Sequence, residues 1–287
     1  MAWDVRGKRI LVTGATSGIG LEAAVELARR GARITMVGRD AARTASARTA
    51  VMERANSNDV DELLGDFGSQ ASIRALAGAF RARHDRLDVL VNNAGGVNSR
   101  RRLGADGIEA TWAVNHLGYF LLTRLLLDLV KKSAPARIVT VASIGHRRGT
   151  LDLDDPGFER GGYSTMRAYS RSKLANVLFA AELARRLEGS GVTSNSLHPG
   201  TVATNIWSGA PTWAKPVIAL LYRPFFISAA AGGQTIVQLA ADPALDGVTG
   251  RYFEKQQPVA PSALAQDEAL ARRLWDASEK QVGLAEA

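Results

Sequence analysis

The sequence contains no cysteine among its 287 residues. That absence excludes disulfide bonds, thiolate metal sites and a cysteine nucleophile. It is typical of proteins that work in a reducing compartment, and the first eight residues are mixed and polar, without the pattern of a signal peptide. We therefore expect a cytoplasmic protein.

Long apolar runs are also scarce. A membrane-spanning helix requires about 20 predominantly apolar residues. The best candidate, residues 117–130, is interrupted by Arg124 and Asp128. The sequence therefore predicts no membrane span.

The charge balance gives little support for a nucleic-acid partner. The formal net charge is +8, from 36 basic and 28 acidic residues, and a basic excess can indicate nucleic-acid binding. Here the arginines are scattered in pairs and triplets, mostly beside alanines in helix-like stretches. They are typical of solvated helix faces, and we predict no nucleic-acid binding.

Short apolar runs alternate with longer helical patterns along the whole chain. Strands are expected at residues 9–13, 32–37, 60–64, 89–92, 137–142, 192–197 and 250–253. Helices are expected at residues 19–30, 41–55, 69–84, 108–131, 167–187, 229–241 and 261–282. This alternation predicts an α/β fold, a doubly wound parallel seven-stranded sheet with helices on both faces, in a single domain over residues 1–287.

Two stretches break the alternation, residues 147–166 and residues 205–228. Both follow expected strands, and ligands in open α/β sheets bind at the carboxyl ends of the strands. The second stretch is rich in aromatic side chains: Trp207, Trp213, Tyr222, Phe225 and Phe226. We interpret it as a segment that covers an apolar substrate, with a membrane-surface patch as the alternative.

A glycine-rich turn follows the first expected strand and opens the first expected helix. Residues 13–20 read Thr-Gly-Ala-Thr-Ser-Gly-Ile-Gly. Glycines allow a tight turn and close approach of the backbone to a pyrophosphate, which the N-terminus of the helix attracts. The position predicts a dinucleotide site, although such a loop can also merely turn the chain.

The end of the second strand bears on the choice of dinucleotide. An acidic side chain there would bind the ribose hydroxyls of NAD, but this strand ends in Gly38 and is followed by Arg39. A guanidinium suits the 2′-phosphate of NADP. The sequence therefore favours NADP(H) over NAD(H). Asp40 is the opposing signal, unless it caps the next helix.

Tyr169 and Lys173 are four residues apart in an expected helix, so they share one face. The pKa of a free tyrosine is about 10, and a neighbouring ammonium lowers it. Such a pair can transfer a proton at neutral pH. Ser143 follows the fifth strand, at the same edge of the sheet, and Asn115 lies in a long helix for which asparagine is a mediocre former.

Several motifs in this order resemble those of the short-chain dehydrogenase/reductase family, in its retinol dehydrogenase-like and carbonyl reductase-like branch. The matching stretches are residues 13–20, 37–40, 92–95, 114–118, 168–179, 198–200, 250–253 and 273–275. The resemblance implies a Rossmann fold and an NADP-dependent oxidoreductase that interconverts an apolar ketone or aldehyde and its alcohol. A non-enzymatic dinucleotide sensor on the same fold is the alternative.

The resemblance also implies a role for each matching residue. Tyr169 would be the general acid/base, and Lys173 would lower its pKa and hold the nicotinamide ribose. Ser143 would polarise the substrate oxygen, and Asn115 would anchor a water that links Lys173 to solvent. Besides Tyr169 and Lys173, the implied cofactor contacts are Gly14, Thr16, Ser17, Gly18, Ile19, Gly20, Arg39, Asp66, Phe67, Asn92, Ala94, Gly95, Pro199, Gly200, Val202 and Thr204.

Two further expectations concern metals and subunits. His116, His146 and His198 lack the spacing and the carboxylate partners of a metal site or catalytic triad, so no metal is expected. The helical stretches 117–130 and 174–187 could form a subunit contact, which leaves homodimer and monomer both open.

Overall fold

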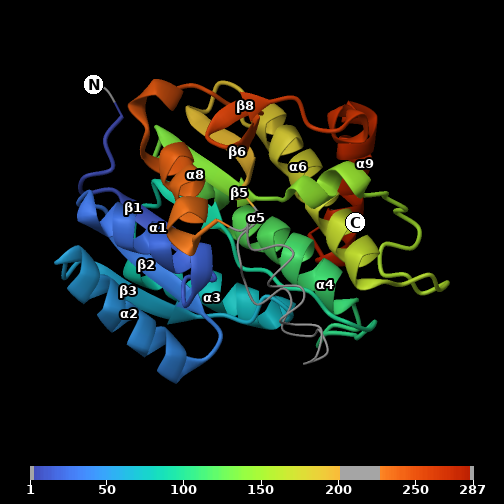
Figure 1. The fold of residues 1–287 in the computed structure, drawn as a ribbon, viewed down its shortest axis with the longest axis horizontal. Helices are drawn as coiled ribbons and strands as arrows, with labels where there is room; N and C mark the ends of the chain where they lie inside the picture. The colour runs from blue at the N-terminus through green and yellow to red at the C-terminus, as the bar shows by residue number, and fades with distance from the viewer. Residues whose placement is uncertain (1–2, 201–226, 285–287) are drawn as a thin grey trace.

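One eight-stranded sheet runs through the protein, in a computed structural model that describes residues 3–200 and 227–284 (Figure 1). Its order is β3-β2-β1-β4-β5-β6-β7-β8, with β1 to β7 parallel and β8 antiparallel to β7. The strands are β1 (Arg9–Thr13), β2 (Arg33–Gly38), β3 (Val60–Leu64), β4 (Val89–Asn92), β5 (Ala136–Val141), β6 (Val192–His198), β7 (Tyr252–Glu254) and β8 (Gln257–Val259). The predicted doubly wound, mostly parallel sheet is confirmed.

The prediction of seven strands was wrong by one. β8 pairs with β7 through a two-residue turn in which Lys255 and Gln256 have φ of 49° and 64°. Such turns favour Asn-Gly or Gly-Gly, and Pro258 inside the strand is a signal against strand structure. The hairpin therefore has no recognisable sequence signature.

Helices cover both faces of the sheet (Figure 1). One face carries α1 (Gly18–Arg29), α2 (Ala41–Ala55) and α8 (Ala229–Ala241), and the other carries α3 (Gln70–Arg83), α5 (Gly118–Lys132) and α6 (Thr165–Arg186). Each face of the sheet has its own hydrophobic core, and the strands contribute side chains to both. In β1, Ile10 and Val12 are buried on the first face and Leu11 on the second. Burial on both faces explains why the strands appear as continuous apolar runs.

The long helix expected at 108–131 is interrupted by a π-helical turn. It consists of α4 (Ala110–Trp112), the π-turn η1 (Ala113–Leu117) and α5. Such turns occur frequently at functional sites, and this one contains Asn115. An 18-residue window of the segment Ala110–Lys132 reaches a mean hydropathy of 1.2, so by length and composition alone this segment could span a membrane, but 78% of that window is buried in the fold.

The C-terminal helix α9 (Glu268–Gln281) packs against α6. Its Trp275 is 2% exposed and lies edge-on to Phe120 of α5 and stacked on Phe179 of α6. α9 therefore covers part of the two helices that we considered for a subunit contact.

The strand order places a topological switch point between β1 and β4. The chain proceeds outward from β1 to β3 and then returns to β4 beside β1. The connections on either side of this switch point diverge, which leaves room at the carboxyl ends of the strands. The glycine-rich turn and residues 93–95 lie there.

Candidate active site

The glycine-rich turn packs directly against the end of β4. Gly14 and Gly18 have φ of +65° and +59°, a conformation that side chains rarely adopt. A Cβ atom on Gly14 would lie 2.7 Å from the Cα of Ala94, and one on Gly20 would lie 2.5 Å from the carbonyl oxygen of Gly14. These close approaches explain why the turn requires glycine.

Asn93 fastens this turn to the end of β4, a bracing role that an asparagine amide at a strand end can fill. Its Nδ2 donates to the carbonyl oxygens of Thr13 at 2.8 Å and Gly14 at 3.1 Å. Its backbone N–H donates to Thr13 Oγ1 at 2.8 Å. The signal was its place between Asn92 and Ala94, at the end of the strand beside β1.

The N-terminus of α1 is left without a side-chain cap. Ser17 is its N-cap residue but makes no capping hydrogen bond. Among the other described helices, capping bonds are accepted by Asp40, Ser69, Ser164, Ser228 and Asp267. The free N–H groups of the first turn of α1 and the positive end of its dipole therefore fit a phosphate. Dinucleotide contacts at Gly14, Thr16, Ser17, Gly18, Ile19 and Gly20 are compatible with this arrangement and stay a prediction.

The end of β2 has no room for an acidic side chain. A Cβ atom on Gly38 would lie 2.5 Å from Thr16 Cγ2 and closer still to Thr44 Oγ1. Asp40 accepts a hydrogen bond from the backbone N–H of Arg43 at 2.8 Å, so its carboxylate caps α2. Arg39 is exposed. Arg43, which we did not predict, lines a cavity of about 460 Å³ together with Thr16.

The side chains of three other predicted cofactor residues are already engaged within the protein. Asp66 Oδ1 accepts from the N–H of Gly68 at 2.9 Å. Phe67 is buried, edge-on to Tyr119 at 6.5 Å. Asn92 is buried and donates to Thr123 Oγ1 at 2.9 Å. The side chains of Phe67 and Asn92 therefore point into the core, and their backbone groups are what a ligand could reach.

Of the cofactor contacts expected after β6, the structure describes only Pro199 and Gly200. Gly200 has φ of +92°, and a Cβ atom there would collide with Ile227. Val202, Thr204 and nearly all of the expected covering segment 205–228 lie outside the described residues.

Tyr169 and Lys173 meet on α6, as their spacing predicts. Lys173 is 4% exposed, and its Nζ lies 5.7 Å from the centre of the Tyr169 ring. The ammonium donates to the carbonyl oxygen of Val141 at 2.9 Å. Val141 is the last residue of β5, so this bond ties α6 to the strand that leads to Ser143.

Burial shifts the pKa values of both groups toward their neutral forms. It lowers the pKa of Lys173 to about 7. It also raises the pKa of Tyr169 above its ordinary value, an effect that the Ser143 hydroxyl opposes. Our expectation that Lys173 lowers the pKa of Tyr169 is therefore not met here, because desolvation dominates. The phenol is protonated at neutral pH and can serve as a proton donor.

Ser143 and Asn115 approach this pair from two other elements. Ser143 is 7% exposed at the carboxyl end of β5, next to Tyr169, and its Oγ accepts from the N–H of Gly145 at 3.1 Å. Asn115 accepts from the N–H of Gly96 and donates to its carbonyl oxygen, both at 2.9 Å. The four predicted catalytic residues thus come from β5, η1 and α6.

Ser172 links Asn115 to α6, which the sequence did not suggest. Asn115 Nδ2 donates to Ser172 Oγ at 3.1 Å, and Ser172 Oγ donates to the carbonyl oxygen of Tyr169 at 2.8 Å. Asn115 therefore fixes the backbone of the turn that carries the phenol. The water that we expect it to anchor stays a prediction.

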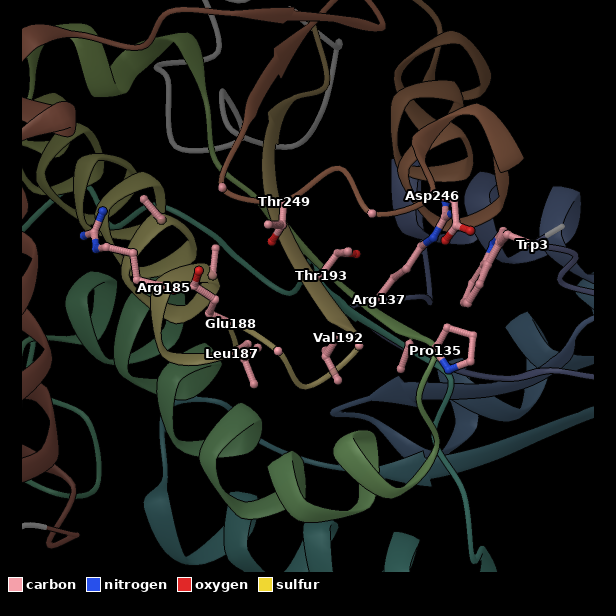
Figure 2. A pocket seen from close by; sticks show the side chains of 17 residues that line it. Trp3, Pro135, Arg137, Arg185, Leu187, Glu188, Val192, Thr193, Asp246 and Thr249 are labelled. Atoms are coloured by element: carbon pink, nitrogen blue, oxygen red, sulfur yellow. The ribbon is translucent and has the colours of Figure 1, made fainter. Parts of the chain in front are cut away.

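A separate cavity of about 670 Å³ lies at the opposite edge of the sheet, near the amino ends of β5 and β6 (Figure 2). It contains none of the predicted site residues. Its Arg137 is 3% exposed, donates to the carbonyl oxygens of Leu239 and Asp242 and lies 4.2 Å from the centre of the Trp3 ring. These contacts hold the first described residues against α8 and give the guanidinium a structural role.

Within the described ranges, no group of three or more acidic or histidine residues could hold a metal ion.

Comparisons with known proteins match most of the chain in sequence and in fold. The sequence model of the short chain dehydrogenase family matches residues 8–215. Human retinol dehydrogenase 14 is 44% identical, with 98% of this chain and 88% of the relative aligned, and human retinol dehydrogenase 13 is 40% identical, with 98% and 86% aligned. Among solved structures, an uncharacterised protein of Mycobacterium paratuberculosis matches with a TM-score of 0.80 and 32% identity over 98% of this chain and 96% of the other. The NADP complex of Pseudomonas aeruginosa RhlG matches with a TM-score of 0.69 and 26% identity over 88% and 95%.

Proposed function

Because the chain belongs to the short-chain dehydrogenase family and is a nicotinamide-dependent oxidoreductase acting on CH–OH groups, we propose that it uses NADP(H) to interconvert an apolar ketone or aldehyde and its alcohol. The observation that carries the proposal is that Tyr169, Lys173 and Ser143 lie together at the carboxyl end of β5, the side of the sheet where α/β folds bind ligands. The bound cofactor would supply the hydride.

The protein side chains bind the substrate oxygen, supply the proton and stabilise the resulting phenolate. Ser143 donates a hydrogen bond to the carbonyl oxygen of the substrate, and Tyr169 transfers its proton to the same oxygen as negative charge develops there. Lys173 stabilises the phenolate that results, because an ammonium at its position favours the charged form of the phenol. Since the pKa of Tyr169 is raised, the phenol begins in the form that reduction requires.

An apolar substrate suits the surroundings of this site. Ile144 follows Ser143 directly and is 41% exposed, and Met166 lies one helical turn before Tyr169 and is 52% exposed. Large apolar side chains exposed near a catalytic group are typical of a binding surface. The relatives named as retinol dehydrogenases act, by those names, on a long apolar alcohol.

We further propose that Arg39 selects NADP(H). Gly38 leaves no room for an acidic side chain, and Asp40 is occupied at the N-terminus of α2. Arg39 is exposed and, among the described residues, has no ion-pair partner within 4.0 Å, so its guanidinium is available to a 2′-phosphate. Arg43 borders the cavity on the same side and adds positive charge.

Arg39→Asp should weaken NADPH binding by about 10- to 100-fold, the scale of a lost charge-assisted hydrogen bond. NADH binding should hold or improve, because NADH lacks the 2′-phosphate that the aspartate would repel. Titration of both cofactors by fluorescence measures the ratio. Arg33→Asp is the matched control, because it makes the same charge change at the other end of β2. An unchanged ratio of affinities in Arg39→Asp would refute this role of Arg39.

The experiment that tests the proposed function is a carbonyl panel. NADPH oxidation would be measured with medium-chain aldehydes, aromatic ketones, retinal, steroids and quinones, and then repeated with NADH. We expect turnover with at least one apolar carbonyl and a higher kcat/KM with NADPH. Tight NADPH binding without turnover on any compound would instead favour a dinucleotide sensor.

A further inference from the structure

His146 is a fully buried histidine next to the proposed site that has no part in the proton transfer above. It lies in the 3₁₀ turn η2 (Ile144–Arg148), three residues after Ser143. Its Nδ1 lies 2.7 Å from the carbonyl oxygen of Ser143. Its Nε2 lies 3.1 Å from the backbone nitrogen of Ser262. Both ring nitrogens therefore have a partner.

These two partners determine the protonation state of the ring. A carbonyl oxygen can only accept, so Nδ1 must carry the hydrogen, and a backbone N–H can only donate, so Nε2 must present its lone pair. His146 is therefore the neutral Nδ1–H tautomer. Burial also lowers its pKa, which is consistent with an imidazole that remains neutral.

The contacts around His146 join the Ser143 turn to the C-terminal part of the chain. The imidazole lies edge-on to the ring of Tyr252 in β7, with 4.7 Å between ring centres. The adjacent Arg147 donates to Glu254 Oε1 at 3.0 Å and to the carbonyl oxygen of Ala260 at 3.1 Å. The turn that follows Ser143 is thus contacted by β7 and by the segment after β8, which lie more than a hundred residues away in sequence.

We infer that His146 is a positioning residue for carbonyl reduction. Its Nδ1–H donates a hydrogen bond to the carbonyl oxygen of Ser143, and the backbone N–H of Ser262 keeps the ring in the tautomer that allows this bond. The inference rests on the proposed function, since it assigns Ser143 to the substrate oxygen. A donor that binds developing charge must be held within a few tenths of an ångström to be effective. The bond to the Ser143 backbone provides that constraint while leaving the Ser143 hydroxyl free to meet the substrate.

The first test compares His146→Ala with His146→Asn in the full-length protein. Asparagine places an amide Nδ2 near the position of Nδ1 and can still donate to Ser143. Alanine removes this side-chain bond and leaves only the backbone N–H of residue 146, which donates to the same carbonyl oxygen at 3.1 Å. We expect His146→Ala to lower kcat by about 10- to 100-fold, as for a reacting group displaced by about 1 Å, with NADPH affinity unchanged. His146→Asn should recover most of that loss. A merely structural histidine would not give selective recovery of kcat, so equal kcat in the two folded variants would overturn the inference.

The second test needs no change at His146. Ser262 has φ of −62°, the value that proline requires, so Ser262→Pro removes the backbone N–H together with the side-chain hydroxyl. Ser262→Ala keeps that N–H and is the matched control. We expect Ser262→Pro to lower kcat by about threefold relative to Ser262→Ala, the scale of one neutral hydrogen bond.

The outcomes separate this inference from the proposed function. Wild-type protein that turns over no carbonyl would refute the function itself. If the wild type is active but His146→Ala keeps its kcat, the function stands and the inference fails. If His146→Ala does not fold, equal kcat in Ser262→Pro and Ser262→Ala decides against the inference.

Discussion

Replacement of Tyr169 by phenylalanine should lower kcat at least about 100-fold, because it removes the general acid while keeping the ring. The phenol lies on α6 beside Ser143, and burial keeps it protonated. NADPH affinity should change little, since the glycine turn and Arg39 that would hold the phosphates lie on other elements. Steady-state kinetics and a fluorescence titration of NADPH separate the two effects.

Tyr163→Phe is the matched control for this experiment. It makes the same chemical change but removes a hydrogen bond of 2.8 Å from the phenol to the carbonyl oxygen of Asn98 and leaves Ser143, Tyr169 and Lys173 in place. We expect this variant to keep wild-type turnover within a small factor. Near-normal kcat in Tyr169→Phe would exclude Tyr169 as the proton donor.

Lys173→Met should abolish most turnover and at the same time stabilise the cofactor-free protein at neutral pH. Turnover falls because the phenolate loses its ammonium, and we expect a loss of about 100-fold or more. Stability rises because methionine fills a similar volume without a buried charge, whereas a buried and poorly paired ammonium is costly. The lysine has one described hydrogen bond, to Val141, and is 4% exposed.

The lowered pKa of Lys173 determines in which direction the free energy of unfolding changes with pH. Burial lowers the pKa of Lys173 from 10.5 in the unfolded chain to about 7 in the folded protein. Between these values the unfolded state binds the additional proton, so the wild-type free energy of unfolding falls as pH drops from about 10.5 to about 7, and the full loss persists below 7. Lys173→Met removes this loss, and its advantage over wild type should be largest at pH 6 and smallest near pH 10.

Denaturant unfolding at several pH values measures this difference. Lys280→Met, on the exposed side of α9, is the control and should follow the wild type at each pH. A Lys173→Met advantage that does not change with pH would contradict the pKa assigned to Lys173.

Local sequence signals predicted most of the sheet and the helices, for a physical reason. The strands are buried on both faces, which makes them apolar runs, and the helices begin at residues such as Asp40, Ser69 and Ser164 that cap them. The glycine turn was readable because its φ values and close contacts exclude other residues. The spacing of Tyr169 and Lys173 placed them on one face of α6.

The features that the sequence did not reveal depend on long-range contacts. β8 follows a turn without glycine or asparagine, so no local signal marks it. The raised pKa of Tyr169 follows from burial by other segments, which the spacing of two residues on one helix does not report. His146 acquires its role from a partner far away in sequence, Ser262.

The most direct test of the account follows the hydride itself. NADPH carrying deuterium at both hydrogen positions of C4 of the nicotinamide ring would be incubated with the protein and a carbonyl found active in the panel, and the product would be analysed by mass spectrometry. We predict one deuterium at the former carbonyl carbon for each NADPH oxidised, with the rate strongly reduced in Tyr169→Phe. NADPH oxidation that leaves no deuterium in an alcohol product would contradict carbonyl reduction at this site.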